Sequence, residues 1–408
     1  MQLRDYQIQI SNQAVEILKV NKFVYLALEV RTGKTLTAIA TAQKFGANNI
    51  LFVTKKKAIS DIQAQSEAFG VKIYATNYEQ LHNLSAEYDL IIIDEAHSIG
   101  AFPVASLRAK ELKRICIGKP IIYLSGTPTP ESYSQIYHQL WVSSFSPFKK
   151  YKTFYAWAND YVNVKQKWIS GRAHNDYSDA NVKLIEQKTR QFMITFTQEE
   201  AGFESFVNEN ILYVKMSELT YKLANRLRID KIVKNSEGQV IMADTAVKLM
   251  QKLHQIYSGT VICEEPDRTV KGFDYTKAEF IKKHFEGKKI AIFYKFKAEL
   301  YILMFVFGKE IGFDVDGFNN DNFRVIALQI VSGREGVNLS KADALVFYNI
   351  DFSATSYWQA RARLQTKDRE KDAQIYWIFS EGGIEDKIYK AVCDKKDYTL
   401  SHFKNDFK

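Results

Sequence analysis

The chain has 408 residues, of which 46% are hydrophobic and 25% charged, with a formal net charge of +9 at pH 7. This ordinary globular composition excludes an intrinsically disordered chain, and at roughly 150 residues per domain the length predicts two or three domains. Three cysteines without a Cys-x-x-Cys spacing exclude a disulfide scaffold and a cysteine zinc site, and they fit a reducing compartment. The basic surplus is too small to name a partner by itself.

Membrane insertion is not expected from the apolar runs. The longest one, Leu300 to Phe307, is far shorter than the ~18 residues that a membrane-spanning helix needs. The polar start MQLRDYQIQI lacks the apolar stretch of a signal peptide. We therefore expect a cytoplasmic protein that makes no membrane contact.

The first part of the chain alternates short apolar runs with amphipathic stretches. The runs are too short for helices and rich in β-branched or aromatic residues, so they predict buried strands at 23–28, 49–54, 89–94 and 120–125. Helices are expected at 34–45 and 56–69. This alternation predicts an α/β domain, residues 1–145, with a parallel sheet covered on both faces.

Aromatic residues and lysines become dense after Phe145, with Asp160 as the only acid before Trp168. Helical spacing of several of these residues predicts a mainly helical insertion, residues 146–202, with Gly171 and Asn175 to Asp179 in loops. The aromatic side chains fit either a packed helical core or a platform for unpaired bases. Thr197 to Phe203, TQEEAGF, has no evident physical role.

The strand and helix alternation resumes after this region and predicts a second α/β domain, residues 203–408. Strands are expected at 289–294, 323–329, 344–349 and 374–379, and helices at 298–307, 356–364 and 384–395.

The segment Glu29 to Thr35, EVRTGKT, lies between a predicted strand and a helix start, where phosphate-binding loops occur. Backbone N–H groups and the helix N-terminus would face the phosphates, Lys34 would reach the β- and γ-phosphates, and the Thr35 hydroxyl would hold Mg²⁺. The full pattern has a glycine where this chain has Leu28, so a turn of another kind is the alternative.

Two carboxylates, Asp94 and Glu95, end the apolar run LIIID, which places them at the edge where open α/β sheets bind ligands. A strand-end aspartate there holds Mg²⁺, and the adjacent glutamate can polarise the attacking water. The alternative is a solvated acidic turn that caps the next helix. Ser125 and Thr127, after the next apolar run, are able to sense the nucleotide, although such a string is often only a turn.

The order GKT, DEAH (Asp94 to His97) and SGTP, with LRDYQ (Leu3 to Gln7) ahead of them, resembles superfamily 2 helicases. The closer resemblance is to the Swi/Snf-type branch of double-stranded DNA translocases, especially short phage-borne members, whose nucleotide loop also lacks the first glycine. The strings IAIFYKFKAEL, QIVSGREGVNL and QARAR, within residues 290–363, resemble motifs IV, V and VI of that branch. The resemblance implies two tandem RecA-like domains with a helical insertion.

The resemblance also implies residue roles. Arg4 and Gln7 would read adenine, Thr35 and Asp94 would hold Mg²⁺, and Glu95 would be the catalytic base. Lys34 and an arginine of motif VI, Arg363 or Arg361, would stabilise the transferring phosphoryl group. The remaining implied contacts are Thr32, Gly33 and Gly336 with the nucleotide, and His97, Ser125 and Thr127 in coupling.

The identity of the motif VI arginine stays open, because the second arginine of the family falls on Thr366. Arg369 is a further substitute, and the alternative is that Arg361 and Arg363 are solvated helix residues. DNA contacts implied by the resemblance fall on Thr54, Lys55, Thr76, Asn77, Tyr78, Lys295, Ser332 and Gly333. Such residues suit phosphate contacts, although each lysine taken singly can be an ordinary surface charge.

The sequence therefore predicts an ATP- and Mg²⁺-dependent enzyme that moves on duplex or branched DNA. We expect a monomer in the cytoplasm, the host cytoplasm if phage-encoded, and recruitment by DNA structure or by a protein partner. A nucleotide-switched clamp without productive turnover and an RNA helicase are the alternatives.

Overall fold

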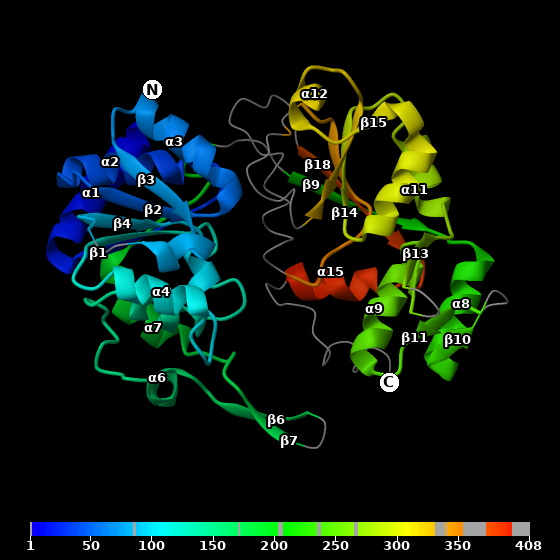
Figure 1. The fold of residues 1–408 in the computed structure, drawn as a ribbon, viewed down its shortest axis with the longest axis horizontal. Coiled ribbons are helices and arrows are strands. Elements are labelled where there is room, and N and C mark those ends of the chain that lie inside the picture. The colour runs from blue at the N-terminus through cyan, green and yellow to red at the C-terminus, as the bar shows by residue number, and fades with distance from the viewer. Residues whose placement is uncertain are drawn as a thin grey trace. The chain divides into compact units, whose positions relative to one another are not determined.

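The structure is a computed structural model that describes residues 2–84, 87–169, 172–202, 207–234, 238–264, 268–330, 339, 341–353 and 373–393. The chain divides into two compact units, Met1–Phe203 and Glu204–Lys408. Each unit is built around its own six-stranded sheet (Figure 1). The mixed α/β class predicted from the sequence is confirmed.

The sheet of the first unit has the strand order β3-β2-β4-β5-β1-β8, and all neighbouring strands run parallel. The strands are β1 (Phe23–Leu28), β2 (Ile50–Thr54), β3 (Ile73–Asn77), β4 (Leu90–Ile93), β5 (Ile121–Leu124) and β8 (Met193–Phe196). Because parallel strands share one direction, the segments that follow β1, β2, β4 and β5 emerge at the same edge.

Helices cover both faces of this sheet, as Figure 1 shows for α1, α2 and α3 on one side and α4 and α7 on the other. Successive strand residues feed opposite cores: Val24 and Leu26 pack with α1 and α2, whereas Phe23 and Tyr25 pack with α4 and α5. The helices are α1 (Asp5–Asn21), α2 (Lys34–Phe45), α3 (Ile59–Ala68), α4 (Leu107–Ile115), α5 (Gln135–Trp141), α6 (Phe154–Tyr161) and α7 (Val182–Thr189).

The region 146–202 is less helical than the sequence predicted. Besides α6 and α7 it contains an antiparallel hairpin, β6 (Lys165–Ile169) with β7 (Arg172–Asp176), which extends from the first unit (Figure 1). Asn175 and Asp176 therefore lie in a strand and not in a loop, since cross-strand pairing orders a polar segment that has no apolar alternation. The segment also supplies β8, which pairs with β1.

Aromatic side chains of this region pack into the core of the first unit. Phe154, Trp157, Ala158 and Tyr161 form the buried face of α6, and Trp157 is 0% exposed. Their spacing of three and four residues is that of one helix face. The packed-core interpretation therefore holds for these rings, which leaves them no free surface for stacking bases.

The second unit repeats the architecture, with the parallel strand order β15-β16-β14-β17-β18-β9. The sheet strands are β9 (Val207–Val214), β14 (Ile290–Tyr294), β15 (Ile311–Gly312), β16 (Val325–Gln329), β17 (Ala344–Phe347) and β18 (Ala373–Ser380). Two short antiparallel pairs accompany them, β10 (Ile232–Lys234) with β11 (Val240–Met242) and β12 (Thr260–Cys263) with β13 (Thr269–Gly272).

Helices also pack on both faces of the second sheet. They are α8 (Glu218–Asp230), α9 (Ala246–Tyr257), α10 (Thr276–His284), α11 (Lys297–Phe307), α12 (Val315–Asn319) and α15 (Glu385–Cys393). The predicted helices at 298–307 and 384–395 correspond to α11 and α15. The one predicted at 356–364 lies outside the described residues.

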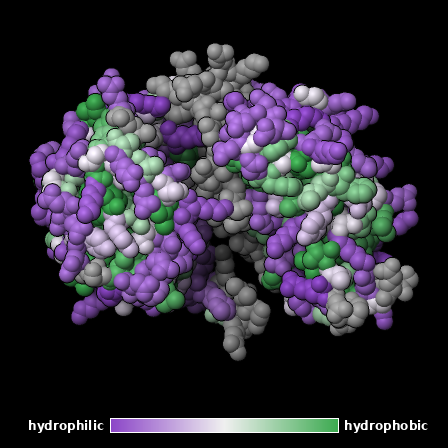
Figure 2. Space-filling model, turned by 45° about the horizontal axis from the view of Figure 1, so that its top comes forward, coloured by the Kyte–Doolittle hydropathy of each residue, from purple (hydrophilic) through white to green (hydrophobic). Residues whose placement is uncertain are grey.

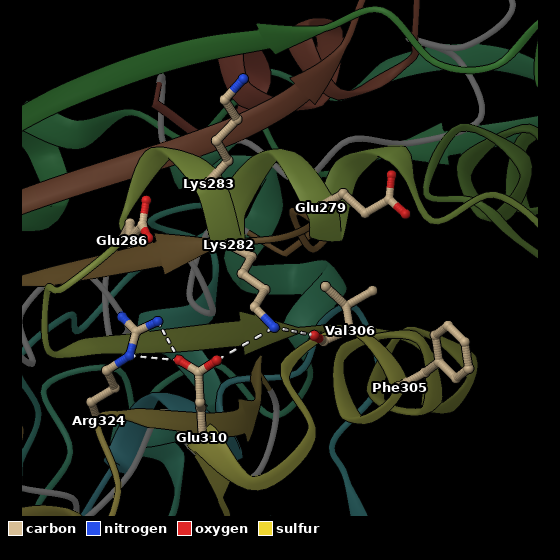
Figure 3. Close-up of a pocket in the computed structure, with 8 residues that line it drawn as sticks. All are labelled: Glu279, Lys282, Lys283, Glu286, Phe305, Val306, Glu310 and Arg324. Atoms are coloured by element: carbon tan, nitrogen blue, oxygen red, sulfur yellow. Dashed lines mark hydrogen bonds and ion pairs between the residues drawn. The ribbon is translucent and has the colours of Figure 1, made fainter.

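The surface visible in Figure 2 is mainly hydrophilic, with hydrophobic side chains in separate patches. One open pocket of about 590 Å³ lies on the second unit, where Glu310 bridges Lys282 and Arg324 (Figure 3). Lys283 points away from that bridge. Acidic and basic side chains balance in the lining, so the pocket offers no charge preference for a polyanion. Among the described residues, no helix is long and apolar enough to cross a membrane.

A buried ion pair joins α10 to α15 inside the second unit. Lys277 Nζ lies 3.0 Å from Glu385 Oε1, and both side chains are 0% exposed. Lys277 Nζ also donates to the Tyr348 carbonyl oxygen at 3.3 Å. Two charges removed from water in this way are stable only as a pair.

Lys277→Met should therefore destabilise the protein by about 3–5 kcal/mol, because it leaves the Glu385 carboxylate buried without its partner. The double variant Lys277→Met with Glu385→Met should recover most of this loss, since two apolar side chains leave no charge. Urea unfolding followed by circular dichroism measures both. A double variant no more stable than the single one would contradict this account.

Candidate active site

Four segments predicted to carry chemistry meet at one edge of the first sheet. Glu29 follows β1, Thr54 ends β2, Asp94 follows β4 and Ser125 follows β5. These strands are neighbours in the order β2-β4-β5-β1, and all run parallel. The sheet thus collects residues that are far apart in the sequence.

The loop Glu29–Gly33 turns the chain from β1 into α2 through two left-handed residues, Arg31 (φ 65°) and Gly33 (φ 80°). Thr32 Oγ1 donates to the Glu29 carbonyl oxygen at 2.7 Å, which closes the turn. A Cβ at position 33 would lie 2.2 Å from Gln7 Nε2 and would adopt an unfavourable φ. The positive φ therefore favours glycine at position 33, and a Cβ there would displace the Gln7 amide.

The start of α1 packs directly against this loop. Gln7 Nε2 donates to the Gly33 carbonyl oxygen at 3.2 Å, while Gln7 Oε1 accepts from the backbone N–H of Arg4 at 2.9 Å. Tyr6 Oη donates to the Thr32 carbonyl oxygen at 3.1 Å, and its ring stacks on Phe196. Gln7 is only 3% exposed. Its amide thus orders the loop, and its adenine contact stays a prediction, as does that of the exposed Arg4.

Lys34 and Thr35 open α2, and Lys34 faces the carboxylate side of the site. The positive charge of Lys34 acts on Asp94 by lowering the pKa of that carboxyl. A Cβ added at Gly126, in the loop after β5, would lie 3.4 Å from Lys34 Nζ. The amine is therefore close to both Asp94 and the Ser125–Thr127 segment.

Asp94 is held by three neighbours. Thr54 Oγ1 donates to Asp94 Oδ2 at 2.8 Å, the backbone N–H of Glu95 donates to Asp94 Oδ1 at 3.0 Å, and Tyr78 Oη donates to the Asp94 carbonyl oxygen. Burial, and next the charge of Glu95, raise the pKa of Asp94 to about 6, against the lowering effects of Lys34 and Thr54. The carboxylate is thus fixed in direction but costly to ionise.

A chain of polar contacts leads from Glu95 to the loop after β5. Glu95 has a left-handed backbone (φ 50°), and its Oε2 lies 3.4 Å from His97 Nδ1. His97 Nδ1 is also 2.9 Å from Ser125 Oγ, which accepts the backbone N–H of Thr127 at 3.1 Å. The structure therefore brings together the three residues predicted to couple the site, His97, Ser125 and Thr127.

Several residues predicted to contact nucleic acid are engaged inside the first unit. Thr54 and Tyr78 hold Asp94, as described above, and both are buried. Asn77 Oδ1 caps the 3₁₀ helix Tyr78–Asn83 by accepting from the N–H groups of Glu79 and Gln80 at 3.0 and 3.1 Å. Thr76 is buried and Lys55 half-buried.

Lys295, at the end of β14 in the second unit, is also engaged. Its Nζ lies 2.8 Å from Asp351 Oδ1 and 3.9 Å from the centre of the Phe352 ring. The ammonium thus has a carboxylate and an aromatic partner within its own unit. Five other predicted site residues, Ser332, Gly333, Gly336, Arg361 and Arg363, lie outside the described residues.

Sequence reasoning missed two side chains that support the loop, Tyr6 and Gln198. Tyr6 lies inside the LRDYQ string, but no role was assigned to it. Gln198 donates through Nε2 to the Val30 carbonyl oxygen at 2.8 Å. The only available signal was the TQEEAGF string itself, because residues 168 positions apart share no local pattern.

The chemistry of these residues fits a nucleoside triphosphate with Mg²⁺. A hydroxyl and a carboxylate are hard oxygen ligands of the kind that Mg²⁺ prefers, so Thr35 and Asp94 are the residues that would hold the ion, and Lys34 would supply a positive charge to the phosphates. The fold defines a protein of two RecA-like α/β units, with this candidate nucleotide site at the sheet edge of the first.

Comparison with known proteins gives the particular family. The SNF2-related domain matches residues 37–261, more than half of the chain, and the domain described as "Type III restriction enzyme, res subunit" matches residues 1–71, which contain the Glu29–Gly33 loop. The chain belongs to the SNF2-related domain family.

The curated relatives match this chain over stretches of different length. The ISWI chromatin-remodeling complex ATPase ISW1 of Saccharomyces cerevisiae is 22% identical over 471 residues, covering 97% of this chain and 40% of that protein. The yeast DNA repair and recombination protein RAD26 is 36% identical over 85 residues, 21% of this chain and 8% of that protein. Human RAD54B, also named as a DNA repair and recombination protein, is 32% identical over 84 residues, 20% of this chain and 9% of that protein. The chain spans 40% or less of the length of each of these relatives.

The raised pKa of Asp94 predicts an acid limb in the pH profile of ATP hydrolysis. A carboxylate that holds a metal must be ionised, so kcat/KM should fall as the pH drops through about 6, where Asp94 takes up a proton. Thr54→Val removes a hydrogen bond that favours the charged form. The acid limb should then move to higher pH by about half a unit to one unit.

Steady-state rates between about pH 5 and about pH 8 measure this shift. Thr195→Val is the matched control, because Thr195 is an exposed threonine of β8 in the same sheet. An acid limb at the same pH in Thr54→Val and in the unchanged protein would show that Asp94 is not the group that titrates.

Proposed function

We propose that the protein is an ATP-dependent DNA translocase or helicase of the Swi/Snf type that moves on duplex or branched DNA. The observation that carries this proposal is the meeting of the GKT loop, Asp94–Glu95 and Ser125–Thr127 at one sheet edge, in a chain of the SNF2-related domain family. The named activities of ISW1, RAD26 and RAD54B are consistent with it.

In this proposal the first unit binds and activates ATP. Lys34 and the N–H groups of the loop bind the phosphates, while Thr35 and Asp94 hold Mg²⁺, which neutralises phosphate charge. Glu95 orients and deprotonates the attacking water as general base. Thr54 and Tyr78 keep Asp94 in place from the ends of β2 and β3.

In this proposal the contacts Glu95–His97–Ser125–Thr127 transmit a change of charge at the site to the loop after β5. Loss or gain of charge near Glu95 changes its interaction with His97, and Ser125 Oγ lies against the same imidazole nitrogen. Because Ser125 also accepts the Thr127 N–H, a shift of the imidazole reaches the loop after β5. We assign coupling to this chain of contacts.

The second unit supplies the remaining parts of the proposal. Arg363, or Arg361, would stabilise the charge that develops on the transferred phosphoryl group, and Gly336 would contact the nucleotide. An arginine that acts only in one state makes hydrolysis depend on the arrangement of the units. Such dependence lets each state hold DNA with a different affinity, as motion requires.

Contacts with DNA are proposed along the ends of β2 and β3 and in the second unit. Lys55 follows β2, and Lys295 follows β14 and lies beside Asp351. Contacts of this kind fix the duplex without reading its sequence. Thr76, Ser332 and Gly333 complete the proposed path. Asn77 contributes by ordering the backbone at the end of β3, where it caps the 3₁₀ helix.

Finer features belong to the same proposal. They are the DEAH-box subtype, the likeness to short phage-borne members, the division into 1–145, 146–202 and 203–408, a monomeric state, and a cytoplasmic location with recruitment by DNA structure or by a partner protein. The resemblance of the strings from LRDYQ to QARAR supports the first two.

Lys34→Ala should abolish ATP hydrolysis, because it removes the charge that binds the β- and γ-phosphates, while salt-sensitive DNA binding stays within about twofold. Phosphate release and fluorescence anisotropy with labelled duplex DNA measure the two properties. Lys72→Ala is the matched control, since Lys72 is exposed just before β3, at the opposite edge of the sheet. Undiminished hydrolysis in Lys34→Ala would refute the site.

The choice of polymer that stimulates hydrolysis tests the proposed substrate. We expect duplex DNA to stimulate phosphate release more than single-stranded DNA or RNA does. Greater stimulation by RNA would indicate an RNA helicase, and binding without any stimulation would indicate a nucleotide-switched clamp. Triplex displacement without fork unwinding would identify a translocase that does not separate strands.

A further inference from the structure

The segment after β8 lies against the nucleotide loop. Gln198 makes two hydrogen bonds with it: the backbone N–H donates to Glu29 Oε2 at 2.8 Å, and Nε2 donates to the Val30 carbonyl oxygen at 2.8 Å. In addition, the backbone N–H of Glu29 donates to the carbonyl oxygen of Phe196, the last residue of β8, at 2.9 Å. The loop is thus attached to the end of β8 at three points.

Gln198 lies in a turn that is stabilised by hydrogen bonds between its own residues. Glu200 Oε2 accepts from the backbone N–H of Thr197 at 2.7 Å and from Thr197 Oγ1 at 3.0 Å, and Thr197 Oγ1 accepts the Glu200 N–H at 3.1 Å. These reciprocal bonds fix the turn without help from the loop. Gln198 is therefore presented to Val30 by a preformed element.

The direction of a carbonyl decides the direction of the next N–H, because both lie in one planar trans peptide and point opposite ways. Outside donors contact three carbonyls of the loop: Gln198 that of Val30, Tyr6 that of Thr32 and Gln7 that of Gly33, which also accepts from Thr37 in the first turn of α2. The N–H groups that follow these carbonyls belong to Arg31, Gly33 and Lys34. Each is thereby directed away from its donor.

We propose that Gln198 is a positioning residue for phosphate binding, which sets the Val30–Arg31 peptide so that the Arg31 N–H faces the phosphates. In this role Gln198, Tyr6 and Gln7 hold the loop from outside, in a chain that has Leu28 where the full pattern has a glycine. The inference rests on the proposal that the GKT loop binds a nucleoside triphosphate, and it deepens that proposal.

The position of Gln198 in the chain gives this contact a second consequence. The first unit ends at Phe203, five residues after Gln198, and the second unit begins at Glu204. A phosphate that accepts from the Arg31 N–H polarises the same peptide and therefore strengthens the Val30–Gln198 bond. Phosphate binding thus acts on the turn that contains Gln198.

The test is Gln198→Met, which keeps the length of the side chain and the backbone bond to Glu29 but removes the donor to Val30. Binding of fluorescent MgADP, and its displacement by ADP, adenosine and inorganic tripolyphosphate, are measured. The affinities for ADP and tripolyphosphate should each fall about threefold to tenfold, the value of one hydrogen bond. The affinity for adenosine should stay unchanged, since it has no phosphate.

Two further variants keep the test decisive. Gln63→Met is the matched control, an exposed glutamine on α3, and should change none of the three affinities. Tyr6→Phe keeps the ring on Phe196 and removes the hydroxyl that donates to the Thr32 carbonyl and accepts from Arg4 Nη1, so it should lower the affinity for tripolyphosphate as Gln198→Met does. If Gln198→Met fails to fold, Gln198→Leu, which also lacks a donor for the Val30 carbonyl, carries the test.

Unchanged ADP affinity, or an equal loss of affinity for adenosine, would overturn the inference, because a general structural defect affects both. None of these measurements needs DNA or hydrolysis. A protein that binds nucleotide as expected but shows no DNA-stimulated turnover would refute the proposed function and leave the role of Gln198 intact.

Discussion

A planar peptide group carries its C=O and N–H in opposite directions, so whatever accepts or donates on one side of a loop decides what is displayed on the other. The segment between Glu29 and Lys34 depends on this constraint. Its carbonyls are held by Gln198, Tyr6 and Gln7, from two elements that flank β1 in space. A phosphate-binding surface can thus be built from groups outside the loop, and the sequence of the loop is then freer to vary.

The parallel sheet places the carboxylates of Asp94 and Glu95 at the edge that also carries the Glu29–Lys34 segment. Thr54, Tyr78 and the Glu95 N–H fix Asp94, but burial and the neighbouring charge of Glu95 make its ionised form unfavourable. Because the ionised form of Asp94 is unfavourable without a counter-charge, a bound cation or the Lys34 ammonium stabilises it strongly. The same edge therefore makes ionisation of Asp94 unfavourable and also provides Lys34, whose positive charge reduces that cost.

Strands buried on both faces, such as Phe23–Leu28 and Leu90–Ile93, could be predicted because they are continuous apolar runs. The edge strands β3 and β8 lack such runs, since Tyr74 and Thr195 are exposed, and they escaped the sequence pattern. The proximity of Lys34 and Asp94 was predictable because each belongs to a compact string that follows a strand of the same sheet. The contact of Gln198 with Val30 was not, because it joins positions that only the pairing of β1 with β8 brings together.

The place of β8 in the sheet has a consequence for dissecting the chain. The composition changes near residue 145, and a fragment cut there would contain every string of the first unit that resembles a helicase motif. It would lack the strand beside β1, and with it the acceptor for the Glu29 N–H and the donor for the Val30 carbonyl. A recombinant fragment, or an exchange of units between relatives, should therefore keep residues 1–202 together.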